Sequence, residues 1–249
     1  MNFDLLIDFH VNAQQQGPGS PASTLRALDM IPIDKQAPLQ LADIGCGSGA
    51  STILLAQHTN AHITAVDLFP AFLDKLNAQA QALGLEARIT TLEASMDALP
   101  FEPSTLDIIW SEGAIYNMGF RKGLAYWSQF LKPGGYLAVS EISWLTEERP
   151  EAIETHWNEA YPEMGTVAEK HQAIAEAGYT LIGDFVLPPS DWLDNYYGPM
   201  EDRMAGFLDR HGHSADAQAI VAEEKKEIDL YTTYQDYLSY GFYVMQKPL

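Results

Sequence analysis

The chain has 249 residues, of which 47% are hydrophobic and 19% charged, a composition that excludes disordered, collagen-like and coiled-coil proteins. With 14 basic against 34 acidic side chains the net charge is −20, which disfavours nucleic acids and anionic membranes as partners. The single cysteine, Cys46, excludes an intramolecular disulfide. The first ten residues hold two acids and no lysine or arginine, unlike a signal peptide. We therefore expect one cytoplasmic domain over residues 1–249, with a small molecule as its partner.

Residues 1–38 precede the first predicted strand and include three glutamines followed by Gly-Pro-Gly-Ser-Pro, at positions 14–21. This composition resists a regular helix but offers side-chain amides and tight turns. Two interpretations remain open for the segment: a lid across the sheet, with Gln16 contacting the substrate, or a flexible linker.

Strands alternate with helices through the middle of the chain. Apolar strands are predicted at residues 39–44, 62–66, 87–93, 106–110 and 136–142, with a first helix at 51–58. A second helix is expected to begin at Pro70 and to end before Gly84. This alternation predicts a doubly wound α/β fold, with a mostly parallel sheet covered on both faces.

The alternation of strands and helices ends towards the end of the chain. Strands are predicted at 180–187 and 240–246, separated by a long and largely helical interval. The two strands are expected to pair antiparallel at one edge of the sheet. The insertion at 189–238 would then cover the carboxyl edge of the sheet, where open α/β sheets bind ligands, and is the second candidate for a substrate lid.

The strongest motif is the turn Asp43-Ile-Gly45-Cys-Gly47-Ser-Gly49 between the first strand and the first helix. Its glycines allow a sharp turn and close approach of a ligand, and the helix beyond offers backbone N–H groups to an anion. Asp67 ends the second strand 22 residues after Gly45, where a carboxylate can accept both hydroxyls of a ribose. These features predict a nucleoside cofactor and leave NAD and S-adenosylmethionine both open.

Five segments resemble, in order and spacing, the motif series of class I S-adenosylmethionine-dependent methyltransferases: residues 41–49 (LADIGCGSG), 65–67 (AVD), 94–101 (ASMDALPF), 106–111 (LDIIWS) and 131–136 (LKPGGY). The resemblance is closest to the ubiquinone/menaquinone-biosynthesis-type branch. Residues 16–20, 110–117 and 140–150 are similar to an uncharacterised bacterial subgroup of that branch. The resemblance implies a seven-stranded sheet with an antiparallel last strand, and S-adenosyl-L-methionine as cofactor.

The same resemblance implies a role for each matching position. The methionine portion of the cofactor would lie on the turn, at Asp43, Gly45, Gly47 and Gly49. The ribose would be bound by Asp67. The adenine would lie beside Leu68, Ser95, Met96 and Asp97. The carbonyl of Ser111 would meet the methionine amino group. Ser95 stands where many members have an acid, so Ser95 and Asp97 both remain candidates for the adenine contact.

Methyl transfer depends chiefly on positioning when the acceptor is already nucleophilic, so no catalytic triad is expected. If the acceptor must lose a proton, the candidate bases are Glu112 and Glu141, at strand ends, and His10. The candidate substrate contacts are Gln16, Tyr116, Asn117 and Trp144.

Two other functions use the same turn. An NAD-dependent oxidoreductase is disfavoured by Asp43 directly before the glycines, by Leu99-Pro100-Phe101 and by the closing strand pair. A non-catalytic S-adenosylmethionine-binding sensor would keep every cofactor motif. The pair His211 and His213 lacks an assigned third ligand, so we expect no metal site.

Overall fold

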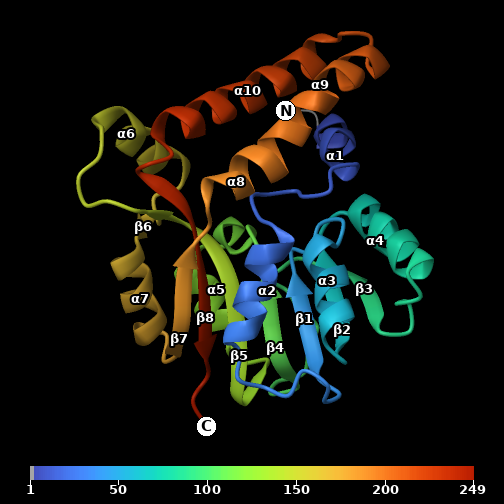
Figure 1. Cartoon of the computed structure of the whole chain (residues 1–249), viewed down its shortest axis with the longest axis vertical. Coiled ribbons are helices and arrows are strands. Elements are labelled where there is room, and N and C mark those ends of the chain that lie inside the picture. Colours follow the sequence, from blue (N-terminus) through green and yellow to red (C-terminus); the bar gives the residue numbers. More distant parts are fainter. Residues whose placement is uncertain (1–2) are drawn as a thin grey trace.

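The computed structural model describes residues 3–249, and its centre is one mixed sheet in the order β3-β2-β1-β4-β5-β8-β7 (Figure 1). A two-residue strand, β6, pairs with β5 outside this path. The strands are β1 (Gln40–Ile44), β2 (His62–Asp67), β3 (Ile89–Glu93), β4 (Leu106–Ser111), β5 (Leu131–Trp144), β6 (Gly165–Thr166), β7 (Thr180–Val186) and β8 (Leu238–Gln246).

The parallel half of the sheet is built around β1, which pairs with β2 on one side and β4 on the other. Asp43 lies opposite both Ala65 and Trp110 in these registers. All of β1 except Gln40 is buried, as expected for a parallel strand covered on both faces. Since the three strands end at one edge, the residues that follow them meet there.

The antiparallel half confirms the predicted closing pair and the seven-stranded sheet. β8 lies between β5 and β7 and runs antiparallel to both, with Phe242 opposite Ser140 and Phe185. Two features differ from the sequence expectation. β6 was not predicted, and β5 begins at Leu131 rather than at 136. Leu131 already pairs with Leu106 of β4, and a register shift over residues 132–135 follows before Tyr136 pairs with Ile108.

Helices cover both faces of the sheet, as the alternation predicted. One hydrophobic core lies under α2 (Pro21–Met30), α3 (Ala50–His58) and α4 (Pro70–Ala82), and a second lies under α5 (Phe120–Trp127) and α7 (Val167–Glu176). Neighbouring strand residues alternate between them, with Ile108 in the first core and Ile109 in the second. The predicted start of α4 at Pro70 is confirmed, and Gly84 follows its end with a φ of 67°.

A group of helices lies beyond the carboxyl edge of the sheet (Figure 1). We call this group the cap: α1 (Phe3–Val11), α6 (Glu151–Ala160), α8 (Pro189–Trp192), the π-helical turn η2 (Leu193–Tyr197), α9 (Gly198–Arg210) and α10 (Ala215–Tyr234). Phe9 is 1% exposed and its ring centroid lies 4.9 Å from that of Phe207. Segments about 200 residues apart in the chain therefore pack together in the cap.

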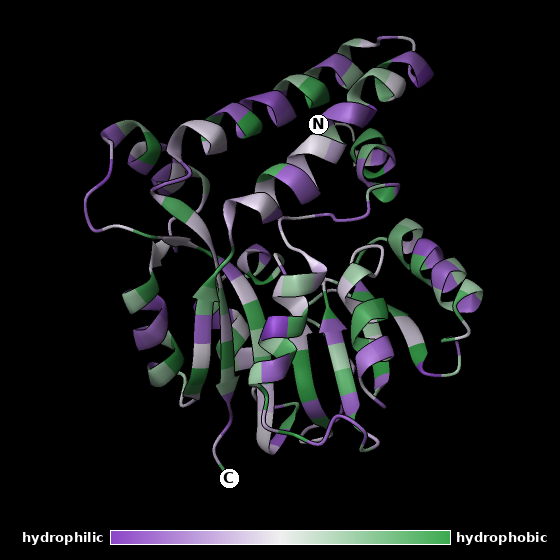
Figure 2. Cartoon of the chain, viewed as in Figure 1, coloured by the Kyte–Doolittle hydropathy of each residue, from purple (hydrophilic) through white to green (hydrophobic). Residues whose placement is uncertain are grey.

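The cap differs in character from the layers around the sheet. In Figure 2 the strands are largely hydrophobic, whereas α10 carries alternating hydrophobic and hydrophilic bands, as expected of a helix with one buried face. No helix within residues 3–249 combines the length and the apolar character that a membrane span requires.

Candidate functional site

The glycine turn after β1 forms one wall of a cavity at the carboxyl edge. Gly45 and Gly47 have φ values of 74° and 53°, which other residues rarely adopt. A Cβ on Gly45 would collide with Ala114 Cβ, and one on Gly47 would lie 2.6 Å from Gln16 Oε1. The turn therefore needs glycine for its conformation and for its close contacts.

The cavity beside this turn has a volume of about 440 Å³, within the range of small-molecule sites. It brings together eleven of the residues proposed from the sequence: Gln16, Gly45, Gly47, Asp67, Leu68, Ser95, Met96, Asp97, Glu112, Tyr116 and Asn117. Other lining residues were missed, among them Phe69 and Phe72. Both could have been predicted from the sequence, because they follow Asp67, the acid at the end of β2, at the start of α4.

Asp67 lines this cavity and is held by the backbone around it. Its Oδ2 accepts the Gly47 N–H at 2.9 Å and its Oδ1 accepts the Phe69 N–H at 3.0 Å. Burial raises the pKa of this carboxyl, and the backbone N–H groups of Phe69, Gly47 and Leu68 oppose that shift. Each oxygen has a further lone pair with which to accept a ligand hydroxyl.

Asp43 lies beneath the turn rather than on the cavity wall. It is fully buried, and its Oδ2 accepts from Ser51 Oγ at 2.9 Å and Thr52 Oγ1 at 2.6 Å. Burial raises its pKa to about 6. Its Oδ1 is buried with no hydrogen-bond partner in the described part of the chain. Asp43 thus holds the start of α3 in place, and the expected contact with a cofactor would be indirect.

Two further cofactor positions also lie off the cavity wall. Gly49 precedes α3 and packs against Leu76. Ser111 is fully buried, and its Oγ donates to the Ile44 carbonyl at 2.7 Å. Neither residue lines the cavity, and both positions support the turn; the expected contact of the Ser111 carbonyl with the cofactor stays a prediction.

Ser95 and Asp97 form one hydrogen-bonded unit on the cavity wall. Ser95 Oγ donates to Asp97 Oδ1 at 2.6 Å, and this bond, followed by the charge of Lys122, lowers the pKa of Asp97. Trp127 Nε1 donates to the Met96 carbonyl between them at 3.0 Å. Ser95 and Asp97 are hydrogen-bonded to each other, so both remain candidates for the adenine contact.

Glu112 is the candidate base that lines the cavity. Its Oε1 accepts from both Trp110 Nε1 and Thr24 Oγ1 at 2.8 Å. Burial raises the pKa of this carboxyl to about 7, although the two hydrogen bonds oppose the shift. Glu112 can therefore exchange a proton near neutral pH.

Replacing Glu112 by glutamine is expected to flatten the pH dependence of stability. The raised pKa means that Glu112 stabilises the fold fully below about pH 4.5 and loses that contribution as pH rises to about 7. The difference corresponds to roughly 3 kcal/mol. Urea unfolding between pH 5 and 7.5 should show a smaller fall for E112Q than for the parent. The same change at the exposed Glu86 should preserve the parental fall; an equally steep fall in E112Q would contradict the prediction.

Glu141 lines neither of the cavities described here. It is fully buried, and its Oε1 lies 2.9 Å from Lys170 Nζ and accepts from Tyr161 OH at 2.7 Å. Burial raises its pKa, and Lys170 opposes that shift. Sequence reasoning placed Glu141 at a strand end, whereas β5 continues to Trp144, and it missed the partner on α7. The expected role as substrate base is therefore corrected to that of a buried counterion.

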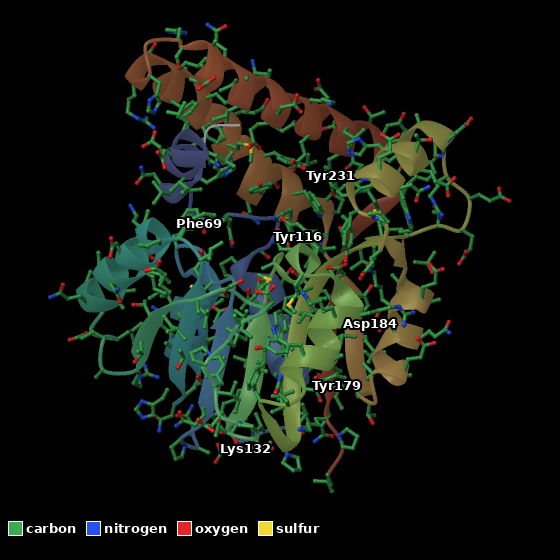
Figure 3. The ribbon with its side chains drawn as sticks, turned by 180° about the vertical axis from the view of Figure 1, so that it is seen from behind. Phe69, Tyr116, Lys132, Tyr179, Asp184 and Tyr231 are labelled. Atoms are coloured by element: carbon green, nitrogen blue, oxygen red, sulfur yellow. The ribbon has the colours of Figure 1, made fainter. Side chains whose placement is uncertain are left out.

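A second cavity, of about 740 Å³, lies between the sheet edge and the cap. Figure 3 labels three of its residues, with Phe69 and Tyr116 on the sheet side and Tyr231 on the cap side. His10 also lines it, with Nε2 3.1 Å from Glu224 Oε1. The two cavities share a boundary made of Gln16, Gly17, Pro18, Phe69, Phe72, Gly113, Tyr116 and Asn117. They are therefore adjoining spaces.

Trp144 occupies a different place from the one expected. It is 2% exposed and lines neither cavity. The Arg149 guanidinium lies 4.5 Å from its ring centroid, an arrangement that stabilises a cation over an aromatic face. The prediction of a substrate contact at Trp144 is thus corrected to a core position at the end of β5.

Gln16 connects the N-terminal segment to the glycine turn. Its Oε1 accepts from the N–H and the Oγ of Ser48, each at 3.0 Å. Its Nε2 donates to the carbonyls of His10 and Ala13 at 3.2 and 3.1 Å. The segment that could have been a linker is thereby fixed beside both cavities.

Replacing Gln16 by alanine is expected to speed proteolytic cleavage within residues 12–20 about tenfold. The change removes four hydrogen bonds of roughly 0.5–1.5 kcal/mol each, and loss of about 1.4 kcal/mol of local stability raises the open population tenfold. Limited proteolysis with mass spectrometry would measure the rate. The exposed neighbour Gln14 provides a control in which Q14A should match the parent, and equal rates for all three proteins would contradict the prediction.

The two histidines considered for a metal face different acids. His211 Nε2 lies 2.8 Å from Asp8 Oδ2, and His213 Nε2 lies 3.0 Å from Asp209 Oδ1. Within residues 3–249 no group of three or more metal-ligating side chains is found. Both histidines therefore serve as partners of carboxylates in the cap.

Residues 41–135 match the family model described as "Methyltransferase domain". The chain is 33% identical over 102 residues to dimethylglycine N-methyltransferase of Parasynechococcus marenigrum, covering 41% of this chain and 36% of that relative. It is 30% identical over 151 residues to the ubiquinone/menaquinone biosynthesis C-methyltransferase UbiE of Allorhizobium ampelinum, covering 57% and 58%. The chain thus matches less than two thirds of the length of either relative.

The fold of the whole chain also has a solved counterpart. The structure of a SAM-dependent methyltransferase from Geobacter sulfurreducens in complex with S-adenosyl-L-homocysteine matches with a TM-score of 0.85, over 97% of each chain and at 17% identity. At that identity the likeness concerns the fold. The family match over the glycine turn and β2 to β4, the methyltransferases among the relatives and this sheet architecture thus make the chain similar to S-adenosylmethionine-dependent methyltransferases in sequence motifs and in fold.

Proposed function

We propose that the protein transfers the methyl group of S-adenosyl-L-methionine to a small-molecule acceptor. The observation that carries this proposal is the pair of adjoining cavities with a shared wall that includes Gln16, Gly113, Tyr116 and Asn117. One cavity is lined by seven of the ten residues assigned to the cofactor, and the other lies under the cap. Such an arrangement suits two ligands that meet at the shared wall.

The residues of the first cavity fit the cofactor chemically. Asp67 offers free lone pairs to ribose hydroxyls, the apolar side chains of Leu68, Phe69 and Met96 suit an adenine, and the turn lines the cavity with the bare backbone of Gly45 and Gly47. When bound, the cofactor would supply a methyl group on a sulfonium, an activated leaving group.

The chain itself would contribute orientation and the exclusion of water. Oriented reactants can lower a barrier by roughly 7–11 kcal/mol, and the cap covers the edge at which they would meet. We assign Gln16, Tyr116 and Asn117 to the acceptor, because each lines both cavities. If the acceptor carries a proton, Glu112 and His10 are the groups placed to receive it.

The organisation proposed from the sequence is kept in part. We propose a single domain over residues 1–249, in which α1 and the glutamine segment of 1–38, together with 189–238, act as the substrate lid. The contact between Phe9 and Phe207 supports this pairing. Within 1–38, α2 belongs to the sheet instead, since it packs against α3, β7 and β8.

Finer assignments remain part of the proposal. The motif series supports a relation to the ubiquinone/menaquinone-biosynthesis-type branch, and the 30% identity to UbiE agrees with it, although relatives that act on other acceptors also match. The charge of −20 supports a small-molecule partner rather than a nucleic acid, and we propose a cytoplasmic location.

Incubation with methyl-labelled S-adenosylmethionine and a fractionated metabolite extract tests the proposal. We expect calorimetric binding of the cofactor and of its demethylated product, and label on a small molecule. Binding without any labelled product would favour the sensor. Tighter binding of NAD than of S-adenosylmethionine would favour the oxidoreductase.

A further inference from the structure

The second cavity is lined by an unusual concentration of tyrosine. Six tyrosines contribute to its walls: Tyr116, Tyr161, Tyr196, Tyr197, Tyr231 and Tyr240. Three of the rings form a chain of contacts, with centroids 5.1 Å apart for Tyr196 and Tyr197 and 5.6 Å apart for Tyr197 and Tyr231, and the rings of Tyr116 and Tyr161 form a separate pair with centroids 6.1 Å apart. Aromatic faces carry partial negative charge and attract cations placed over them.

Some of these hydroxyls have capacity left for a ligand. No hydrogen bond joins the hydroxyl of Tyr196 or Tyr240 to another group in the described chain, although these residues are only 8% and 9% exposed. Tyr197 donates its hydroxyl proton to Glu227 at 3.0 Å, which leaves its oxygen free to accept. The wall thus presents oxygen lone pairs to a donor inside the cavity.

Three carboxylates on one side of α10 complete the cavity: Glu223, Glu224 and Glu227. Glu224 pairs with His10, and Glu223 lies 3.7 Å from Lys226. Within residues 3–249, Glu227 has no lysine, arginine or histidine within ion-pair distance. Its side chain is exposed; desolvation, and then the charge of Glu224, raise its pKa, and His10 lowers it. Glu227 is therefore a solvent-accessible carboxylate of the cavity that has no ion-pair partner within the described chain.

The charge of Glu227 also reaches the wall shared with the cofactor cavity. Tyr116 lines both cavities and is 39% exposed; desolvation, and then the charges of Glu227 and Glu141, raise its pKa.

We propose that the acceptor is a small organic amine, bound as its ammonium ion among the tyrosine rings and against Glu227. This inference rests on the proposed methyl transfer. Before transfer, the ammonium gives one proton to the Glu227 carboxylate. The nitrogen lone pair then forms a bond to the methyl carbon as the carbon–sulfur bond breaks, and the bonding pair stays on sulfur. The product is the methylated ammonium ion together with the neutral thioether.

A quaternary ammonium probe tests the cation site without any transfer, because it has no lone pair to methylate. Calorimetry would compare choline with its uncharged carbon analogue 3,3-dimethylbutan-1-ol and with the anion 3,3-dimethylbutanoate, each with and without S-adenosylhomocysteine. We expect choline to bind at least tenfold more tightly than the alcohol, and the anion not to bind. Equal affinity for choline and the alcohol would overturn the inference.

The variant E227Q removes the charge while its amide oxygen can still accept from Tyr197. We expect it to lose the tenfold preference for choline and to keep the affinity of the parent for the alcohol. The matched control D229N removes the same charge from an exposed position of α10 that does not line the cavity, and should keep the preference. A preference that persists in E227Q would overturn the role of Glu227.

The labelled-methyl experiment separates this inference from the proposed function. Selective choline binding with no labelled product would support the cation site and refute methyl transfer. Label on a phenol or a carboxylate, with no preference for choline, would support methyl transfer and refute the amine.

Discussion

Replacing Asp67 by alanine is expected to weaken binding of S-adenosylmethionine about a hundredfold. The variant loses two charge-assisted hydrogen bonds to the ribose, each worth at least about 1.5 kcal/mol, or about 3 kcal/mol in total. It also frees the N–H groups of Gly47 and Phe69, which Asp67 holds at 2.9 and 3.0 Å. Calorimetry with the cofactor and with its demethylated product would measure the loss.

The control for this variant is Asp74, an exposed acid on α4. D74A makes the same change in net charge, so it should bind the cofactor like the parent and thereby separate a local loss from a general electrostatic effect. Thermal unfolding of D67A would establish that it folds. A folded D67A with parental affinity would show that the cofactor cavity has been misplaced.

Replacing Lys170 by methionine is expected to lower the free energy of unfolding by about 3–5 kcal/mol at pH 7. Lys170 is 3% exposed, and its Nζ lies 2.9 Å from Glu141 Oε1. Without it, the fully buried Glu141 would keep a charge with no cation beside it. Because burial already raises the pKa of Glu141, the deficit should shrink as pH falls and the carboxyl takes up a proton. Urea unfolding at pH 5 and pH 7 would measure both effects.

Two further variants make the Lys170 prediction specific. K122M removes an exposed lysine that lies 3.7 Å from Asp97, and should change stability by no more than about 0.5 kcal/mol. The double variant E141Q/K170M removes both buried charges and should recover most of the loss. A double variant as unstable as K170M would assign the loss to packing, for example against Phe120, whose ring centroid lies 4.7 Å from Lys170 Nζ.

The sheet could be predicted closely because short apolar strands, and the proline and glycine residues that begin and end the elements between them, are local signals in the sequence. Pro70 and Gly84 fixed α4 correctly, and the two closing strands indicated the antiparallel pair. The start of β5 at Leu131 and the pairing of β6 escaped prediction. Both depend on which strand lies alongside, and the local pattern carries no information about that.

The candidate site likewise contains residues that the sequence predicted correctly and residues whose role depends on distant partners. Asp67 and the first glycines follow from a contiguous motif, and the structure places them together on one wall. The partner of Glu141 lies 29 residues away on another element, so a strand-end acid read from the sequence could not be recognised as a counterion. Trp144 was misplaced for the same reason, since its burial depends on packing at the far end of β5.

The position of β8 within the sheet has a consequence for how the protein acquires its structure during translation. β8 is the last of the eight strands to be synthesised, yet it lies between β5 and β7, and β7 has no other partner within the described chain. One side of β5 and all of β7 must therefore remain without their β8 contacts until residues 238–246 have left the ribosome. Such exposed strand edges invite pairing with other chains. A nascent chain stalled before residue 238 would therefore be the state of this protein most in need of a chaperone.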